Sequence, residues 1–266
     1  MADMYLPLTP DYQALFRVTF EQAAIGIAHV APDGRWVRVN KKLSDILGYS
    51  HEELLQLTFQ DVTYSADLDA DLDKVNALLA GEIASYQIEK RYIRKNGQPV
   101  WTHLTVSLVR TEAGAPDYFI SVVEDIQTRK DDEATIRLQK AQLHVVFENL
   151  DAGIVMANLN GDIVYWNRRA REMHGYNDDQ NLNRNVAEFM SVFEFHNAHG
   201  HVLPLSDWPL MRILCGETLR GLNLVVKRKD MDWQRQYRYR GSLALDNTGK
   251  AVMAMIIISS TGGEDD

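Results

Sequence analysis

The residues best suited to metal chemistry form one short cluster. His196, His199 and His201 lie within six residues of one another, and the imidazole nitrogen is a common zinc ligand. A tetrahedral site would need a fourth ligand, and Glu194 or Asp207 would have to fold back to supply it. A polar surface loop explains the same residues. We therefore predict no metal and keep the three histidines as weak candidates.

The sequence contains no pattern for covalent or phosphoryl chemistry. It has no glycine-rich phosphate loop, no Gly-x-Ser-x-Gly elbow and no His-Glu-x-x-His motif. The single cysteine, Cys215, excludes an internal disulfide, and we interpret it as a buried small thiol. His144 is not followed in this sequence by the ATP-binding motifs that accompany a phosphoacceptor histidine, so we interpret it as a solvated residue of a helix. We predict that this chain is not an enzyme.

Composition narrows the possible partners. A net charge of −9 argues against nucleic acid or an anionic membrane, because phosphate binding needs a basic field. No stretch approaches the roughly 18 consecutive apolar residues of a membrane span. Residues 1–10 lack the basic and apolar regions of a signal peptide. We predict a cytoplasmic protein with no membrane or nucleic-acid partner, and 266 residues are enough for two domains.

The chain repeats itself at an interval of about 127 residues. Residues 20–27 align without a gap with residues 147–154, and Asn40 then aligns with Asn167. Later in the chain the interval is about 135 residues. A unit of this length is too long for a solenoid repeat. The repeat therefore predicts two copies of one small globular domain.

Each copy predicts two strands, several short helices and then three strands. The first two strands flank Asp33-Gly34 in one copy and Asn160-Gly161 in the other, which are hairpin-turn sequences. This order predicts the α+β class, with a five-stranded antiparallel sheet and helices on one face in each domain. The expected strands are 25–30, 36–39, 86–94, 100–110 and 118–124, then 154–157, 163–166, 221–229, 233–245 and 251–259.

Helix signals in the first copy are specific. Residues 40–47 form a short amphipathic pattern, and Gly48 follows where a helix C-cap glycine belongs. Ser50 and Glu53 have the spacing of a capping box. Residues 67–80 carry a longer apolar stripe and predict the main helix of the domain.

A charged helical segment, residues 128–148, is expected between the copies. Apolar residues recur there at spacings of 4, 3 and 4, which is the pattern of a short coiled-coil seam. Two heptads are marginal alone, so the helix should dock on a domain or on a partner chain. We predict a homodimer with this seam: Ala134, Leu138, Ala141 and Val145.

The motifs of the first copy resemble a PAS domain with its C-terminal PAC motif. The resemblance rests on residues 20–27, 33–40, 47–54, 89–97 and 122–126. The second copy keeps the opening motifs but replaces a Lys-Asn-Gly turn and carries an insertion, residues 195–209. The expected boundaries are a tail (1–12), the first PAS domain (13–127), a helical linker (128–148), the second PAS domain (149–261) and a second tail (262–266).

The resemblance implies a sensory function in a bacterial signal-transduction protein. Such a module detects a small ligand or partner and regulates a histidine kinase or a cyclic-dinucleotide enzyme, in cis or in trans. Asp125, Ile126 and Gln127 align with the family's Asp-Ile-Thr triad, which passes the signal to an output helix. Two alternatives stay open, a ligand-free dimerisation or adaptor module and a haem or flavin sensor of redox state or gas.

The expected ligand pocket lies between the sheet and the main helix. In the first copy its residues are almost wholly apolar, which is typical of a packed core. In the second copy Trp166, Asn167, Arg212 and Arg238 are candidates to bind an acidic or aromatic molecule. No cofactor is required by the sequence. Neither main-helix region contains a histidine for haem, and Cys215 lies outside the helix that carries the reactive cysteine of photoactive flavin relatives.

Overall fold

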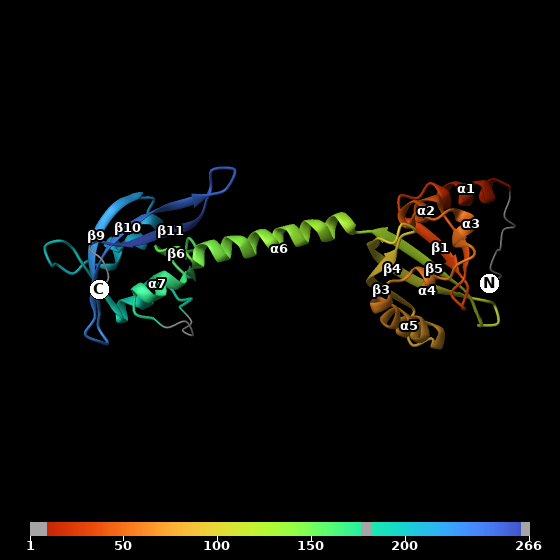
Figure 1. Cartoon of the computed structure of the whole chain (residues 1–266), viewed down its shortest axis with the longest axis horizontal. Helices are drawn as coiled ribbons and strands as arrows, with labels where there is room; N and C mark the ends of the chain where they lie inside the picture. The colour runs from red at the N-terminus through yellow and green to blue at the C-terminus, as the bar shows by residue number, and fades with distance from the viewer. Residues whose placement is uncertain (1–9, 177–181, 262–266) are drawn as a thin grey trace, which may run out of the picture. The chain divides into compact units, whose positions relative to one another are not determined.

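The computed structural model describes residues 10–176 and 182–261, so the predicted tail 262–266 and most of the tail 1–12 lie outside them (Figure 1). The chain divides into two compact units, Met1–Arg137 and Leu138–Asp266. Each unit has its own antiparallel sheet, its own helices and its own hydrophobic core. The predicted α+β class is confirmed.

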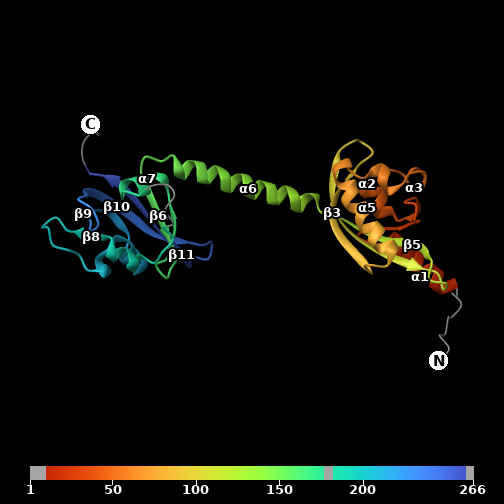
Figure 2. The ribbon, with the colours of Figure 1, turned by 90° about the horizontal axis from the view of Figure 1, so that it is seen from below.

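The first unit has a five-stranded sheet in the order β2-β1-β5-β4-β3. Helices α2 to α5 lie on one face of this sheet (Figure 2). The elements are α1 (Pro10–Glu21), β1 (Gly26–Val30), β2 (Trp36–Val39), α2 (Lys41–Leu47), α3 (His51–Leu54), α4 (Phe59–Val62), α5 (Ser65–Ala80), β3 (Ser85–Ile93), β4 (Pro99–Arg110) and β5 (Pro116–Asp125).

The local signals act as predicted. Gly34 turns the first hairpin with a φ of 96°, a conformation that favours glycine. Asn40 caps α2 at its start, and Gly48 ends it in the left-handed conformation. Ser50 and Glu53 form the capping box that begins α3.

Helix α1 was not predicted. The first strand was expected at residues 25–30 and β1 begins at Gly26, but no element was expected where α1 forms. Phe16 and Phe20, one helical turn apart, stack at 5.8 Å, and Phe20 also lies against His29 of β1. His29 points away from its buried neighbours along β1, so α1 packs on the sheet face opposite the core. This tertiary contact stabilises a helix for which the local sequence signal is weak.

The second unit has one more strand than expected, in the order β7-β6-β11-β10-β9-β8. The extra strand, β8 (Phe193–His196), pairs with β9, and it forms because Phe193 and Phe195 alternate into the core. The other elements are β6 (Gly153–Ala157), β7 (Ile163–Trp166), α7 (Arg168–Met173), η1 (Val186–Ser191), η2 (Leu205–Asp207), α8 (Pro209–Leu214), β9 (Leu219–Arg228), β10 (Gln234–Leu245) and β11 (Ala251–Ser260).

Helix α6 (Gln127–Glu148) contains residues of both units. None of its 22 residues is buried, and it exposes five large apolar side chains. The exposed apolar residues of α6 are Ile136, Leu138, Leu143, Val145 and Val146.

Throughout residues 10–176 and 182–261, no helix is both long and apolar enough to cross a membrane.

Candidate functional site

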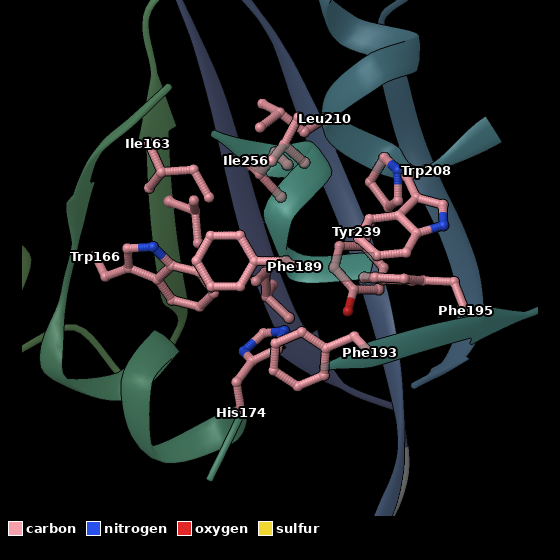
Figure 3. Close-up of a pocket in the computed structure, with 14 residues that line it drawn as sticks. Ile163, Trp166, His174, Phe189, Phe193, Phe195, Trp208, Leu210, Tyr239 and Ile256 are labelled. Carbon is pink, nitrogen blue, oxygen red and sulfur yellow. The ribbon is translucent and has the colours of Figure 1, made fainter. Parts of the chain in front are cut away.

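The interior of the second unit contains an apolar cavity of about 50 Å³. Figure 3 shows aromatic side chains around it from β7, η1, β8 and β10. None of the lining side chains carries a charge at neutral pH. They are Val155, Ile163, Trp166, His174, Val186, Phe189, Phe193, Phe195, Trp208, Pro209, Leu210, Tyr239, Ile256 and Ile258.

The aromatic rings of the wall are in mutual contact. The Trp166 ring meets His174 edge-on at 5.1 Å and lies 5.9 Å from the Phe189 ring. On the other side of the cavity, the rings of Phe195 and Trp208 lie 4.6 Å apart. Edge-to-face and tilted pairs at these distances are favourable and hold each ring in place. The wall is therefore a shaped surface for an apolar molecule.

Two polar atoms of this wall have no partner among the described residues. They are the Trp166 indole nitrogen Nε1 and the Tyr239 hydroxyl oxygen, and both atoms are buried. Burial raises the pKa of Tyr239 well above its usual value, so the hydroxyl keeps its proton. A buried donor without an acceptor costs about 1–3 kcal/mol. The Trp36 indole nitrogen in the core of the first unit is equally buried and without a partner among the described residues.

His174 is a buried neutral residue in the same wall. Burial lowers its pKa to about 4, so the ring carries no charge at neutral pH. Its Nδ1 lies 2.8 Å from the carbonyl oxygen of Ala170. Since a carbonyl only accepts, Nδ1 carries the ring proton and Nε2 is left as an acceptor. The wall of the cavity is therefore uncharged at neutral pH.

The interior of the first unit is filled instead by a charged network. The Lys90 ammonium donates to Asp71 Oδ2 at 2.5 Å and to Thr63 Oγ1 at 2.9 Å. The Tyr86 hydroxyl donates to the other Asp71 oxygen at 2.8 Å. The side chains of Lys90 and Asp71 are 0% and 1% exposed, and burial lowers the pKa of Lys90 although Asp71 opposes that shift. The remaining cavity is only about 20 Å³.

The expectation of an almost wholly apolar interior in the first copy was therefore wrong. Asp71 lies on the stripe of α5 that includes Val75, and Lys90 alternates along β3 with the buried Tyr86 and Tyr92. Each residue occupies a core position of its own element. That shared position was the signal for a buried pair, since a lone buried charge is too costly to keep.

The two interiors differ at equivalent positions. Lys90 pairs with Thr102 on the neighbouring strand. Tyr237, which lies 135 residues after Thr102 and is its equivalent in the repeat, pairs with Leu224. The lysine of one core is therefore a leucine in the other. Conversely, the residues that stand 127 or 135 positions before Trp166, His174 and Tyr239 are aliphatic: Val39, Leu47 and Leu104.

The four predicted ligand residues do not come together. Trp166 lines the cavity, whereas Asn167, Arg212 and Arg238 are not among its lining residues. Arg212 donates to Glu217 at 2.5 and 2.7 Å, and Arg238 Nε donates to an amide oxygen on the neighbouring strand at 3.1 Å. A ligand role for these four residues remains a prediction. Sequence reasoning missed His174 and Tyr239.

Asn167 joins the end of α6 to the start of α7. Its amide oxygen accepts from the backbone nitrogens of Ile154 at 2.7 Å and Ala170 at 2.9 Å. Its amide nitrogen donates to the carbonyl oxygens of Phe147 at 2.8 Å and Ala152 at 2.9 Å. The side chain is fully buried. Asn40 makes the same four contacts in the first unit, at distances of 2.9 to 3.0 Å.

The last residue of α6 strengthens this joint. Glu148 accepts from the Tyr165 hydroxyl and from the Arg168 backbone nitrogen, both at 2.8 Å. Arg171 Nη2 lies 3.3 Å from the same carboxylate, and its Nη1 donates to the Trp166 carbonyl at 2.6 Å. The cavity wall and the end of α6 are therefore linked through one arginine.

The predicted signal-transfer residues lie at the other end of α6. The Asp125 carboxylate accepts from Arg94 at 3.1 Å and from the Gln127 backbone nitrogen at 2.8 Å. The Gln127 side-chain oxygen accepts from the Trp101 backbone nitrogen at 3.0 Å, and Ile126 is buried. These contacts fix the direction in which the chain leaves β5. Their role in signalling remains a prediction.

The histidine cluster occupies a turn after β8. His196 Nδ1 lies 3.1 Å from the Gly200 carbonyl oxygen, and its Nε2 lies 3.5 Å from Glu194. His199 and His201 donate through their backbone nitrogens to one asparagine side chain. In the part of the chain that is described, no three His, Cys, Asp or Glu side chains are grouped to hold a metal ion.

The prediction of a buried thiol was wrong, because Cys215 is exposed. The residue forms the C-cap of the short helix α8. It lies just beyond the helical turn whose apolar face enters the core. One residue of displacement along a helix is enough to move a side chain from the core to solvent.

Two family models match the chain. A PAS domain model matches residues 23–128, and a PAS fold model matches residues 141–198. The chain belongs to the PAS family. Its two PAS domains are a sensory type of module, and the predicted identity as tandem PAS domains of a bacterial signalling protein is confirmed.

Relatives of this PAS chain include bacterial signalling proteins. A probable diguanylate cyclase, DgcE of Escherichia coli (strain K12), is 42% identical over 159 residues, which are 60% of this chain and 14% of that protein. The sensor histidine kinase TmoS of Ectopseudomonas mendocina is 24% identical over 57% of this chain and 16% of its own length. The chain therefore matches only a small part of either relative.

Among solved structures, the PAS domain of a protein from Colwellia psychrerythraea is similar to this chain. It is 16% identical with a TM-score of 0.41, and the match covers 44% of this chain and 98% of that domain.

Proposed function

We propose that the chain is a sensory tandem PAS module whose second domain detects a small molecule in its interior. The carrying observation is the contrast between the two cores. The first is closed by its own ion pair and keeps a cavity of only about 20 Å³, whereas the second keeps an uncharged apolar cavity of about 50 Å³. The two relatives named above are a probable diguanylate cyclase and a sensor histidine kinase, which supports regulation of a histidine kinase or a cyclic-dinucleotide enzyme, in cis or in trans.

The proposed signal leaves the second domain through α6. Trp166 lines the cavity, and the next residue, Asn167, holds the Phe147 carbonyl near the end of α6. A ligand that displaces the Trp166 ring would shift this asparagine and the Arg171 bridge to Glu148. A small change in the core then becomes a change in the direction or rotation of a helix.

The first domain is proposed to hold the other end of the same helix. Asp125, Ile126 and Gln127 fix the start of α6 through the contacts to Arg94 and Trp101. Because the core of this domain is closed, we assign it the role of a rigid relay. The sensing step belongs to the second domain.

We propose that α6 pairs with the same helix of a second copy. Leu138 lies on the predicted seam and is 60% exposed, so pairing would bury it. The variant Leu138→Glu is expected to convert the dimer into a monomer, because it places two carboxylates in one seam. Light scattering of the purified chain measures this. The control Gln139→Glu adds the same charge off the seam and should leave the dimer intact; a dimeric Leu138→Glu would contradict the seam.

Filling the cavity tests the sensing role. Ile163 lines the cavity, and the residue 127 positions earlier is Trp36, so Ile163→Trp places the larger ring of the first domain into the second. The control Val164→Trp adds the same ring on the exposed side of β7. Native mass spectrometry is expected to show a bound small molecule on the unmodified chain and on the control, but not on Ile163→Trp.

Other results point to the alternatives. A native mass without added ligand on all three proteins would favour the ligand-free dimerisation or adaptor module. An added mass equal to haem or flavin would favour a redox or gas sensor. An added mass that survives Ile163→Trp would place the ligand outside the cavity.

A further inference from the structure

The outer face of the second-domain sheet, which points away from the core, carries a group of arginines. On β10, the exposed Arg238 and Arg240 alternate with buried tyrosines, so both arginines project from the outer face. Arg220 of β9 is exposed and pairs directly with Arg240. Directly paired residues of antiparallel strands project to the same face, with Cβ atoms about 4.5–5.5 Å apart. Together these three residues form the arginine patch.

A bulge in β9 draws the patch together. Gly221 is the extra residue of β9 between the partners of Tyr239 and Arg240. Its φ of 145° is a conformation that favours glycine. A methyl group at Gly221 would lie 3.7 Å from the Arg238 Cδ atom. The side chain of Arg238 therefore lies against the residue next to Arg220.

No carboxylate of the described chain neutralises the patch. Elsewhere in the domain, arginines form ion pairs with a nearby glutamate or aspartate. In the part of the chain that the structure describes, no acidic side chain pairs with Arg220 or Arg240. Arg238 donates to the neutral amide of Asn223 at 3.1 Å. Like charges directly opposite each other destabilise a pair of strands, and an anionic group placed over the patch would remove this cost.

The patch is a property of the second domain rather than of the fold. At the positions 135 residues before Arg238 and Arg240, the first domain has His103 and Thr105. These two residues alternate along β4 with buried residues, so they lie on the same outer face. The whole chain has a net charge of −9, so the patch also opposes the overall composition. A requirement of the fold does not explain the arginines, whereas an acidic binding partner does.

The surface around the patch restricts the kind of partner. Ile257 of β11 pairs with Arg240 on the side opposite to β9 and is 36% exposed. Met255 is half-buried and follows on the same face. Positive charge therefore lies beside apolar side chains on an open sheet face, whereas small-molecule sites are concave. The negative net charge of the chain disfavours nucleic acid and an anionic membrane, which need a broad basic field.

We propose that the arginine patch, together with Ile257, is a docking surface for an acidic segment of a partner protein. The segment would carry two or more carboxylates next to an apolar side chain. Arginine binds carboxylates through paired hydrogen bonds, and carboxylates over Arg220 and Arg240 would remove the repulsion between them. The apolar side chain would cover Ile257. This proposal goes beyond the sensing function and does not require a ligand in the cavity.

The test measures the binding of fluorescent synthetic peptides to the full chain at low and at high salt. The probe peptide repeats Glu-Glu-Leu, and two control peptides repeat Lys-Lys-Leu and Gln-Gln-Leu. We expect the Glu-Glu-Leu peptide alone to bind, and we expect its affinity to fall as salt screens the charges. If this peptide does not bind the unmodified chain at low salt, or if Gln-Gln-Leu binds equally well, the proposal is wrong.

Two matched triple variants locate the site. The patch variant replaces the three arginines by glutamine: Arg220→Gln/Arg238→Gln/Arg240→Gln. It should bind the probe at least about 10-fold more weakly, the value of one charge-assisted hydrogen bond. The control variant removes the same charge from three exposed residues elsewhere and should bind like the unmodified chain: Arg17→Gln/Arg137→Gln/Lys140→Gln. An equal loss in both variants would show that net charge attracts the peptide, and would overturn the proposal.

Further measurements test the folding of the variants and the class of partner. Because the arginines are exposed and repel one another, the patch variant should resist urea at least as well as the unmodified chain. A clear loss of stability would assign the arginines a structural role instead. The variant Arg220→Glu/Arg240→Glu should bind the Lys-Lys-Leu peptide. Duplex DNA or phosphatidylglycerol vesicles that bind more tightly than the probe, and lose binding in the patch variant, would overturn the assignment to a protein partner.

Discussion

Replacing Lys90 by methionine is expected to destabilise the first PAS domain by about 3–5 kcal/mol, because it leaves the buried Asp71 carboxylate without its opposite charge. The double variant Lys90→Met/Asp71→Leu should recover much of this loss, since a hydrophobic pair of similar volume often replaces a buried ion pair without cost. The second domain already has Leu224 at the position of the lysine. Urea unfolding of the full chain measures the free energy of each variant.

Lys95 supplies the matched control. It pairs with Glu53 at 2.5 Å, but both side chains are about half exposed. Exposed pairs contribute about 0–1 kcal/mol, so Lys95→Met should unfold almost like the unmodified chain. If Lys90→Met loses less than about 1 kcal/mol, the buried network does not hold the first core together, and the proposed contrast between the two domains fails.

Lowering the pH from 6.5 to 4 is expected to destabilise the second PAS domain by about 3 kcal/mol through His174 alone. Its pKa is about 4 in the folded domain against an ordinary value of 6.5. Between these two values the unfolded chain binds a proton that the folded domain excludes. The contribution of His174 to stability is therefore complete above pH 6.5 and is lost as the pH falls toward 4.

The pH dependence of the unmodified chain is compared with that of the variant His174→Leu. Leucine is chosen because Leu47 stands 127 positions earlier, at the equivalent position of the first domain. The variant's free energy of unfolding should depend less on pH between 6.5 and 4, by about 1.4 kcal/mol for each pH unit. His201→Gln changes an exposed histidine and should keep the full dependence. Equal slopes for His174→Leu and the unmodified chain would show that His174 is not buried in its neutral form.

Local sequence signals were enough for most of the fold. Asp33-Gly34 and Asn160-Gly161 each placed a hairpin, and Ser50 with Glu53 placed a helix start. These signals act over a few residues, so a sequence contains them in full. The repeat interval then gave the second domain from the first.

The features that sequence reasoning missed depend on contacts between distant residues. Helix α1 is stabilised because Phe16 and Phe20 pack against His29 of the sheet. The strand β8 exists because Phe193 and Phe195 reach the core next to β9. Neither contact can be predicted from the residues of the element alone, because the partner residues lie elsewhere in the chain.

The candidate site shows the same division. Trp166 was a candidate because of its aromatic side chain, but Tyr239 on β10 reaches the cavity through the register of three strands. Asn167 was a ligand candidate, whereas its side chain bonds to four backbone groups, one each on Phe147 of α6, Ala152, Ile154 of β6 and Ala170 of α7. Side-chain type alone does not separate these two roles.

The measurement that tests the central proposal most directly is an isoleucine methyl spectrum of the full chain, recorded before and after adding a small-molecule extract of the expressing cells. The proposal predicts shifts of Ile163, Ile256 and Ile258, which line the second-domain cavity, and no shift of the buried Ile46 in the first domain. In Ile163→Trp, the methyl groups of Ile256 and Ile258 should no longer shift. In Val164→Trp, all three cavity isoleucines should still shift. A spectrum in which Ile46 alone moves would contradict the assignment of sensing to the second domain.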